Sequence, residues 1–387
     1  MTRSGSRAGS RSRAGSRAVR RPDDPLRFAI VGPGLAGAVH AAALARIPDA
    51  HLAVVAGSTP GSAGAARLAA AHGARPVDGL ADVLADASLD AVIVCTPHPL
   101  HAGQAIAAAR AGLHVIVEKP MALTVADCSA MIEAADAANV VLSVISQRRW
   151  YPAARRVKAA IDDGRIGAPG LATVEVLGWR GPEYYEMSAW RGTRDGEGGG
   201  VLVNQAVHQL DLASWFLGPA LEVDGWTANL NHPGIEVEDT AVAIVRFASG
   251  ALASVVTSNS QRPGLHARVH VHGRNGGSVG VETDRGSSFV AGVTLPSEPR
   301  NDLWTIPGEE GRPETWAEED RAALSGVDIA THHHELQLRD VVGAIREGRR
   351  PAVDGADGRA TVALMAAIDE ASRTGGRVRL GADGTTS

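Results

Sequence analysis

The sequence predicts an α/β protein with two domains, a doubly wound parallel sheet followed by an α/β domain with a mainly antiparallel sheet. Two observations support this fold class. Apolar runs of strand length alternate with Ala-rich helical runs from residue 26 to residue 144, as in parallel sheets with helical crossovers. From about residue 150 the apolar runs alternate with period two and are separated by Gly-rich turns. The 387 residues also exceed the roughly 250–300 that one hydrophobic core usually serves.

Residues 1–24 differ in composition from the rest of the chain. They are rich in Arg, Ser and Gly, and no acidic residue precedes Asp23. With almost no apolar side chain to bury, this tail cannot offset its ordering entropy, so we expect disorder. Arg20-Arg21 does not start a twin-arginine signal, because Pro22-Asp23-Asp24-Pro25 stands where an apolar segment must follow. Two alternatives stay open: a basic arm for nucleic acid or another acidic surface, and a translation start upstream of the functional one.

Composition argues against several classes of protein. The formal net charge of −5 gives no electrostatic basis for nucleic-acid binding by the folded part. No stretch approaches the ~20 apolar residues of a membrane span. Cys95 and Cys128 are too few for a disulfide framework or a zinc cluster. We therefore expect a cytoplasmic protein with no bound metal and with neither nucleic acid nor a membrane as a partner.

The folded part begins with a buried strand at residues 26–31, and the motif Gly32-Pro33-Gly34-Leu35-Ala36-Gly37 and a helix follow at once. Strand, glycine-rich turn and helix in this order predict a dinucleotide-binding site. Gly32 permits the tight turn, Gly34 lets a pyrophosphate approach the backbone, and Gly37 lets the helix pack closely on the strand. The phosphates would then meet the helix N-terminus, at Leu35 and Ala36.

The second strand, at residues 52–56, ends where a dinucleotide-binding domain recognises the ribose, about 20 residues after the last glycine. Gly57 and Ser58 stand there, so no carboxylate is present to bind the 2′-hydroxyl of NAD or to repel the 2′-phosphate of NADP. With Arg67 on the following helix, this pattern slightly favours NADP and leaves NAD open.

The alternation continues through the first domain, with helices expected at 63–72, 80–87, 102–111 and 121–138 and strands at 91–95, 115–117 and 140–144. The loop after the strand at 91–95 carries Thr96, Pro97, His98 and His101, and the strand at 115–117 runs into Glu118 and Lys119. Ligands of open α/β sheets bind at the carboxyl ends of the strands. We therefore expect these residues to face the cofactor.

Lys119 stands out because the chain has only two lysines among its 38 basic residues. A lysine is a compact donor whose pKa falls readily on burial, which suits proton and alkoxide chemistry better than a guanidinium does. The plainer alternative is a surface charge at a strand end. Lys158 illustrates that alternative, since it falls on the polar face of an expected amphipathic helix.

The second domain is expected to contain a hairpin, with strands at 241–247 and 251–257. Residues 265–272 alternate strictly and place His266, His270 and His272 on a side of the sheet that faces solvent or another subunit. Residues 297–325 are expected to form a loop, and residues 336–346 and 360–372 to form helices. The run His332-His333-His334 lacks a second cluster for a metal site, but one of its members can reach the substrate pocket.

Gly198-Gly199-Gly200 opens a further helix that ends at Leu217-Gly218-Pro219. On it, Asn204, His208 and Asp211 are spaced i, i+4 and i+7, so we expect them on one face. A neutral imidazole suits a general base near neutral pH. In this interpretation Asp211 orients the ring of His208; the alternative is a core histidine that Asp211 satisfies.

Together these motifs resemble the Gfo/Idh/MocA oxidoreductases, which include glucose–fructose oxidoreductase and inositol dehydrogenase. The resemblance extends over roughly residues 26–378 and includes the glycine motif, Thr96-Pro97, Glu118-Lys119-Pro120, the helix with His208, and the segment from Arg339-Asp340 to Asp354-Gly355. It implies a Rossmann domain, placed at residues 25–148, and a substrate-binding domain with an open antiparallel sheet, placed at 149–378. We expect a flexible C-terminus at 379–387 and, from the family's use of the open sheet, a homodimer or homotetramer.

The resemblance also implies NAD(P)-dependent hydride transfer to or from a sugar, cyclitol or related substrate. The family's lysine and histidine fall on Lys119 and His208, whereas Asn204 replaces the aspartate that the family often has four residues before the histidine. Asparagine can orient a hydroxyl but cannot carry a proton. We expect His208 to act as general base, Lys119 to stabilise the oxyanion, Asn204 to position the same oxygen, and Glu118 to orient Lys119 or the nicotinamide.

Other contacts are expected on either side of the reacting atoms. His98 and His101 are expected to flank the nicotinamide. The expected substrate contacts are Tyr184, Tyr185, Trp190 and Arg191, with core packing as the alternative for Trp190. Two alternative functions stay open: an NAD(P)-binding transcriptional regulator without turnover, which Asn204 would suit, and a glycosidase that uses NAD only transiently.

Overall fold

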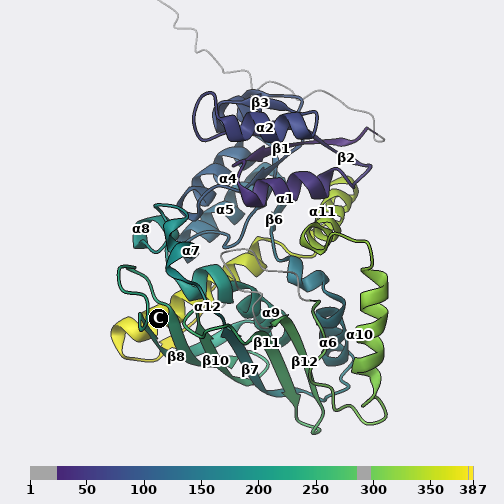
Figure 1. Cartoon of the computed structure of the whole chain (residues 1–387), viewed down its shortest axis with the longest axis vertical. Coiled ribbons are helices and arrows are strands. Elements are labelled where there is room, and N and C mark those ends of the chain that lie inside the picture. Colours follow the sequence, from purple (N-terminus) through teal and green to yellow (C-terminus); the bar gives the residue numbers. More distant parts are fainter. Residues whose placement is uncertain (1–23, 286–297, 382, 387) are drawn as a thin grey trace, which may run out of the picture.

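The computed structural model describes residues 24–285, 298–381 and 383–386. It contains two α/β domains, which lie one above the other in Figure 1, and it confirms the predicted fold class. The predicted disordered tail at residues 1–24 lies outside the described residues except for Asp24. Within the described residues, no helix has both the length and the apolar composition that crossing a bilayer requires.

The first domain is built on six parallel strands in the order β3-β2-β1-β4-β5-β6. The strands are β1 (Leu26–Val31), β2 (Ala50–Ala56), β3 (Arg75–Val77), β4 (Ala91–Val94), β5 (His114–Val117) and β6 (Leu142–Val144). The helices are α1 (Leu35–Leu44), α2 (Ala63–Ala71), α3 (Leu80–Ala85), α4 (His101–Arg110) and α5 (Val125–Ala138). The chain moves outward from β1 to β3 and then crosses to β4, so the strand order reverses between β1 and β4. This reversal places a ligand crevice at the carboxyl ends of β1 and β4.

The second domain is built on a seven-stranded sheet in the order β12-β11-β7-β10-β9-β8-β13. The strands are β7 (Pro169–Leu177), β8 (Ala220–Ala228), β9 (Thr240–Phe247), β10 (Leu252–Ser258), β11 (His266–Gly273), β12 (Ser278–Arg285) and β13 (Val378–Arg379). Neighbouring strands are antiparallel except for the parallel pair β7 and β10. The predicted hairpin is confirmed as β9 and β10, with Ile244 opposite Ser254.

Helices cover one face of this sheet and link it to the first domain. They are α6 (Pro152–Asp162), α7 (Pro182–Glu186), α8 (Arg194–Glu197), α9 (Val207–Leu217), α10 (Arg312–Ala323), α11 (Ile329–Glu347) and α12 (Gly355–Thr374). A π-helical turn, Leu202–Ala206, leads into α9, and the 3-10 turns η1 (His98–Leu100) and η2 (Gln147–Trp150) precede α4 and α6.

The expected loop at residues 297–325 is wrong, because α10 occupies its second half. Two tertiary contacts anchor this helix. Trp316 packs edge-on against Trp304, with ring centroids 4.7 Å apart, and Arg156 pairs with Asp320. The polar composition concealed a helix that depends on these two partners.

Helix α11 packs on the first domain although it belongs to the last part of the chain. Its buried Leu338, Val341 and Val342 join a core that includes Phe28 and Ile30 of β1. Figure 1 shows α11 beside α1. The late segment therefore helps to complete the core of the first domain.

The beginning of the expected flexible C-terminus is ordered. Val378 and Arg379 pair with Val223 and Glu222 of β8, and the backbone N–H of Leu380 donates to the carbonyl oxygen of Leu221 at 2.9 Å. The edge of β8 supplies the hydrogen-bond partners that hold these residues.

Candidate active site

A cleft of about 760 Å³ lies between the two domains. The first domain contributes the carboxyl ends of β1, β4 and β5, and the second contributes α7, the π-helical turn, the start of α9 and β12. In Figure 1 the boundary between the two domains lies where α7 and α8 approach the first domain. Most of the predicted cofactor and catalytic residues line this cleft.

The three glycines after β1 lie in three different backbone surroundings. Gly32 has a φ of +102°, and a Cβ there would lie 2.5 Å from the carbonyl oxygen of Cys95. At Gly37 a Cβ would lie 2.2 Å from the carbonyl oxygen of Gly32, whereas at Gly34 it would meet no atom within 4 Å. No side chain caps α1, and Leu35 is 70% exposed beside the open Gly34. The uncapped helix start and the open space fit the pyrophosphate of a dinucleotide.

Gly57 and Ser58 line the cleft at its ribose end, together with Gly79 and Leu80. A Cβ at Gly57 would lie 2.3 Å from the Cβ of Ser62, the residue that caps α2. Glycine at 57 therefore allows the close approach of α2. The missed residue here is Asp78, which follows the short exposed strand β3 and accepts a hydrogen bond from the backbone N–H of Gly61 at 2.9 Å. Arg67 is exposed and does not line the cleft.

The loop after β4 is held in place by its own polar groups. The Thr96 hydroxyl donates to Gln104 Oε1 at 2.7 Å. The ring of His101 is fully buried, with Nδ1 2.9 Å from the carbonyl oxygen of Pro120 and Nε2 2.8 Å from that of Thr96. His101 therefore joins this loop to the turn that contains Lys119. His98 Nδ1 lies 3.0 Å from the carbonyl oxygen of Glu197, and burial, together with the charge of Lys119, lowers the pKa of His98 to about 3.

Glu118 is fixed by His40, a residue that the sequence did not single out. The two side chains lie 2.8 Å apart, between His40 Nε2 and Glu118 Oε1, and Glu118 Oε2 accepts the backbone N–H of Lys119 at 3.0 Å. Burial raises the pKa of Glu118, but the hydrogen bond and charge of His40 outweigh it and hold the pKa at about 2. His334, from the run His332-His333-His334, packs edge-on against His40, with ring centroids 5.3 Å apart. It does not line the cleft.

Lys119, Asn204 and His208 come together at the centre of the cleft. Lys119 Nζ donates to the backbone carbonyl oxygen of Asn204 at 3.1 Å, and burial lowers the pKa of Lys119. Burial, followed by the charges of Arg148 and Lys119, lowers the pKa of His208 well below its usual value. The imidazole of His208 is therefore neutral and able to accept a proton.

Asp211 does not orient His208. Its carboxylate binds Arg149 through Nε at 3.0 Å and Nη2 at 2.7 Å, and it does not line the cleft. No residue in the described part of the chain hydrogen-bonds the ring of His208. Asp211 lies one helical turn from His208, as its spacing indicates. Its carboxylate binds Arg149 because η2 lies beside this part of α9, and this partner could not be predicted from the spacing along the helix.

The substrate half of the cleft is rich in arginine. Arg148, Arg180 and Arg191 all line it, and Arg148 Nη1 pairs with Asp284 Oδ2 at 2.5 Å. The guanidinium of Arg191 lies over the rings of Tyr184 and Trp190, at 4.3 and 4.7 Å from the two centroids. Arginine side chains stacked on aromatic rings are well suited to hold carboxylate or phosphate groups.

Tyr184 and Trp190 line the cleft as predicted, but Tyr185 does not. The Tyr185 hydroxyl is buried and its ring packs against Tyr184 and His232. Successive residues of a helix point about 100° apart, so only one of the two tyrosines on α7 can face the cleft.

Glu197 is the main residue of this site that the sequence did not indicate. It is 1% exposed, its Oε2 accepts the backbone N–H of Gly192 at 2.6 Å, and its Oε1 accepts Nδ2 of Asn204. Burial raises the pKa of Glu197 to about 7, against the opposing effects of the Gly192 N–H and of Arg191. A carboxylate directly before three glycines and seven residues before Asn204 is the sequence signal that could have found it.

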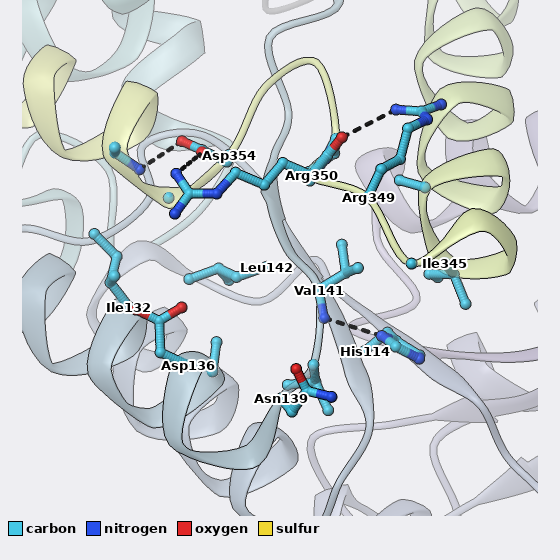
Figure 2. Close-up of a pocket in the computed structure, with 17 residues that line it drawn as sticks. His114, Ile132, Asp136, Asn139, Val141, Leu142, Ile345, Arg349, Arg350 and Asp354 are labelled. Carbon is cyan, nitrogen blue, oxygen red and sulfur yellow. Dashed lines mark hydrogen bonds and ion pairs between the residues drawn. The ribbon is translucent and has the colours of Figure 1, made fainter.

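A second cavity of about 410 Å³ lies at the opposite end of the parallel sheet, where β5 and β6 begin (Figure 2). Three of the charged side chains around it, Arg349, Arg350 and Asp354, already have partners. Arg349 binds Asp340 at 2.9 Å and the carbonyl oxygen of Arg350 at 3.0 Å, and Arg350 lies 3.5 Å from Asp354. None of the predicted site residues lines this cavity.

The histidines of β11 interact with neighbours in the sheet region. His266 lies 2.9 Å from Glu175, His270 lies 2.7 Å from Asp302, and His272 lies 2.9 Å from Ser278. Within residues 24–285, 298–381 and 383–386, no three His, Cys, Asp or Glu residues form a group that could hold a metal ion.

Comparison with known proteins gives consistent results for the two halves of the chain. Residues 26–146 match the family described as "Oxidoreductase family, NAD-binding Rossmann fold", and residues 154–279 match the "GFO/IDH/MocA C-terminal domain". Inositol 2-dehydrogenase of Rhizobium meliloti is 30% identical over 88% of this chain and 94% of its own length. 1,5-anhydro-D-fructose reductase of Ensifer adhaerens is 33% identical over 82% of this chain and 88% of its own.

A solved structure resembles the whole arrangement. The WlbA dehydrogenase from Bordetella pertussis, in complex with NADH and UDP-GlcNAcA, superposes with a TM-score of 0.81 at 34% identity. The match covers 93% of this chain and 99% of that one.

Proposed function

Because the chain belongs to the GFO/IDH/MocA family of NAD-binding oxidoreductases, we propose that it uses NAD to oxidise a CH–OH group of an acidic sugar derivative, or NADH to reduce the corresponding carbonyl. The observation that carries the proposal is the meeting of Lys119, Asn204 and His208 at the centre of a cleft whose other half has the dinucleotide-binding glycines. These three side chains are a basic lysine, a polar amide and a neutral imidazole, as alcohol oxidation requires.

The proposed cofactor is NAD rather than NADP, although the sequence slightly favoured NADP. Gly34 and the N-terminus of α1 would hold the pyrophosphate, and the exposed side chain of Leu35 would pack against the nucleotide. At the ribose end, Val77 accepts the backbone N–H of Gly57 and the carboxylate of the next residue, Asp78, accepts that of Gly61. Asp78 does not itself line the cleft, but its charge lies near the cleft residue Gly79 and would disfavour the 2′-phosphate of NADP. The WlbA dehydrogenase that resembles this chain binds NADH.

In the proposed mechanism the substrate hydroxyl lies between Lys119, Asn204 and His208. Nicotinamide, when bound, supplies the hydride acceptor or donor. His208 is neutral and takes the hydroxyl proton, while Lys119 stabilises the negative charge that develops on the oxygen. The backbone carbonyl of Asn204 holds Lys119 Nζ in place, and Glu118, itself fixed by His40, anchors the backbone of Lys119.

The arginines of the cleft favour an acidic substrate. Arg148 is paired with Asp284, Arg191 lies 3.8 Å from Glu197 and stacks on two aromatic rings, and Arg180 lies over Tyr184 at 5.1 Å. Together they give the substrate half a positive field that a carboxylate or phosphate would neutralise. UDP-GlcNAcA, the ligand of the WlbA dehydrogenase, carries both kinds of group.

We further propose that the chain forms a homo-oligomer through the uncovered face of its second sheet. Trp226, Val242 and Val256 are cross-strand neighbours on that face, and Leu252 lies opposite Leu171. Ile244 is 61% exposed and Trp226 is 65% exposed. A contiguous apolar patch on a sheet marks an interaction surface, and a second copy would cover it with the same residues.

The test is to incubate the purified protein with NAD or NADP and with UDP-GlcNAcA, with UDP-GlcNAc, which keeps the diphosphate but lacks the carboxylate, and with the neutral myo-inositol, and to record net reduced cofactor. We expect NADH formation with UDP-GlcNAcA, slower reaction with UDP-GlcNAc, and slower or no reaction with myo-inositol. Net NADH formation would also separate a dehydrogenase from a regulator without turnover and from a glycosidase that regenerates NAD. Equal activity on neutral and acidic sugars would contradict the proposed substrate class, and no turnover with any of them would contradict the proposed reaction.

A further inference from the structure

We propose that Glu197 is a positioning residue that decides which atom of the Asn204 amide faces the substrate, so that protonation of this one carboxyl changes the site from hydrogen-bond acceptor to donor. The inference rests on the proposed function for its catalytic consequence. The contact itself is a property of the folded protein and can be tested without turnover.

The two hydrogen bonds to Glu197 fix the orientation of the Asn204 side-chain amide. Oε2 faces the backbone N–H of Gly192, which can only donate, and Oε1 faces the amide of Asn204. An ionised carboxylate has acceptors only. Asn204 must therefore turn its Nδ2 group toward Glu197. Because Asn204 lines the cleft and Glu197 lies buried behind it, the carbonyl Oδ1 of Asn204 is left for the substrate.

Protonation reverses this arrangement. Gly192 still requires an acceptor, so the unprotonated oxygen of Glu197 must stay opposite its N–H, and the acid O–H must point at Asn204. That O–H needs an acceptor, which Asn204 can provide only by turning its amide over. Its Nδ2 group would then face the cleft. The reacting hydroxyl gives its one proton to His208, so the group that loses its acceptor Oδ1 is a neighbouring hydroxyl of the sugar, which would then have to accept from Nδ2 instead of donating.

The surroundings of Glu197 make both states accessible. Arg191 Nη1 lies 3.8 Å from Oε1 and, like the charge of Lys119, favours the ionised form, whereas Glu238 favours the protonated form. Tyr184 and Tyr185 also lie near, and burial raises the pKa of each. His98 contacts only the backbone carbonyl of Glu197. Burial raises the pKa of Glu197 to about 7, so the two states exchange near neutral pH.

The test is a double-substitution cycle with Glu197→Gln and Asn204→Asp. In Glu197→Gln the amide oxygen can accept from Gly192 and the amide nitrogen can donate to Asn204, so Asn204 turns over as it does opposite the protonated acid and presents Nδ2 to the cleft. In Asn204→Asp two carboxylates face each other. In the double variant the amide introduced at position 197 can accept from Gly192 through its oxygen and donate through its nitrogen to the carboxylate introduced at position 204. That carboxylate again presents an oxygen to the cleft, so the chemical complementarity is restored although both residues have changed.

With NAD and UDP-GlcNAcA as the probe, we expect kcat/KM of each single variant to fall about 10- to 100-fold, which corresponds to the loss of one charge-assisted hydrogen bond. The double variant should recover most of this loss. The wild-type profile of kcat/KM for oxidation should fall on the acid side near the pKa of Glu197, about 7. That limb should disappear in the double variant. The exposed Glu236, which accepts the backbone N–H of Arg194 at 2.9 Å, offers the matched control Glu236→Gln, which should leave rate and profile unchanged.

Thermal unfolding of the same four proteins with NADH present tests the contact independently of turnover. Asn204→Asp should melt at a lower temperature because two carboxylates face each other, Glu197→Gln should change little because both of its partners can stay hydrogen-bonded, and the double variant should recover the loss. Additive losses in melting temperature would overturn the proposed contact, whatever the substrate is. If the changes in melting temperature are not additive but none of the four proteins turns over any probe, the contact is supported and the proposed function is refuted instead. A Glu197→Gln enzyme with wild-type rate and an unchanged acid limb would refute the positioning role.

Discussion

Arg149 holds Asp211 in a bidentate ion pair, with Nε and Nη2 at 3.0 and 2.7 Å from the two carboxylate oxygens. Arg149 also binds Asp357 through Nη1 at 2.9 Å. The three residues belong to η2, α9 and α12, so the pair connects the end of the first domain to two helices of the second. Asp211 thereby fixes the helix that carries His208 without a hydrogen bond to the histidine.

Replacing Asp211 by Asn should therefore reduce stability more than it alters the chemistry. Both partners are buried, and removing one leaves the other charge without its counter-ion, at a cost of about 3–5 kcal/mol. Urea unfolding would measure this loss, and Asp162→Asn at the exposed pair with Lys158 is the control, expected to change stability by less than about 1 kcal/mol. A folded Asp211→Asn protein with unchanged stability and a shifted pH profile of kcat would show that Asp211 acts on His208.

Lys119→Met should lower kcat by about 10²–10³-fold, since the oxyanion would lose its charged donor. Binding of NADH, followed by tryptophan fluorescence, should persist because the glycines and the start of α1 are unchanged. The chain has one other lysine, Lys158, which pairs with Asp162 on the surface of α6, so Lys158→Met is a matched control with near-normal turnover. Similar rates for the two variants would remove Lys119 from the mechanism.

Glu118 should contribute to stability in a way that depends on pH. Its pKa is about 2 in the folded protein against 4.5 for a free side chain, so the folded state binds fewer protons than the unfolded state between these values. The contribution is complete above about pH 4.5 and is lost as the pH falls toward 2, by roughly 3 kcal/mol in all. In urea unfolding, the stability difference between wild type and Glu118→Gln should shrink by about 2 kcal/mol from about pH 5 to pH 3.

The exposed Glu347, whose side chain is 63% accessible, provides the control Glu347→Gln for the loss of a surface carboxylate. A difference between wild type and Glu118→Gln that stays constant with pH would mean that His40 does not hold Glu118 in its ionised form.

A charge on the uncovered sheet face should disrupt the proposed oligomer. Ile244 is 61% exposed in the apolar patch, two residues from Val242 on β9 and next to β10, which carries Leu252. Ile244→Glu should shift the mass measured by light scattering after size exclusion toward the monomer, because the interface would bury an unpaired carboxylate. Leu230→Glu, which alters an exposed apolar residue outside the sheet strands, is the control. A wild-type protein that is already monomeric would contradict the proposal directly.

Local patterns were sufficient for much of the fold and for the centre of the site. Strand, glycine turn and helix depend on contacts between near neighbours, so spacing alone predicted the tight turn at Gly32, the open space at Gly34 and the close contact at Gly37. Lys119, Asn204 and His208 were found because strand ends of a parallel sheet and the faces of a helix follow directly from periodicity. The cleft does bring these three together.

The partners of these residues depended on the tertiary structure. Asp211 binds Arg149, and Glu118 binds His40, which lies 78 residues away in the sequence. Tyr184 rather than Tyr185 lines the cleft. Glu197 became important only because α8 placed it behind Asn204. Sequence periodicity determines which way a side chain points along its own element, but the partner that a buried polar group finds, and so its protonation, depends on how distant elements pack.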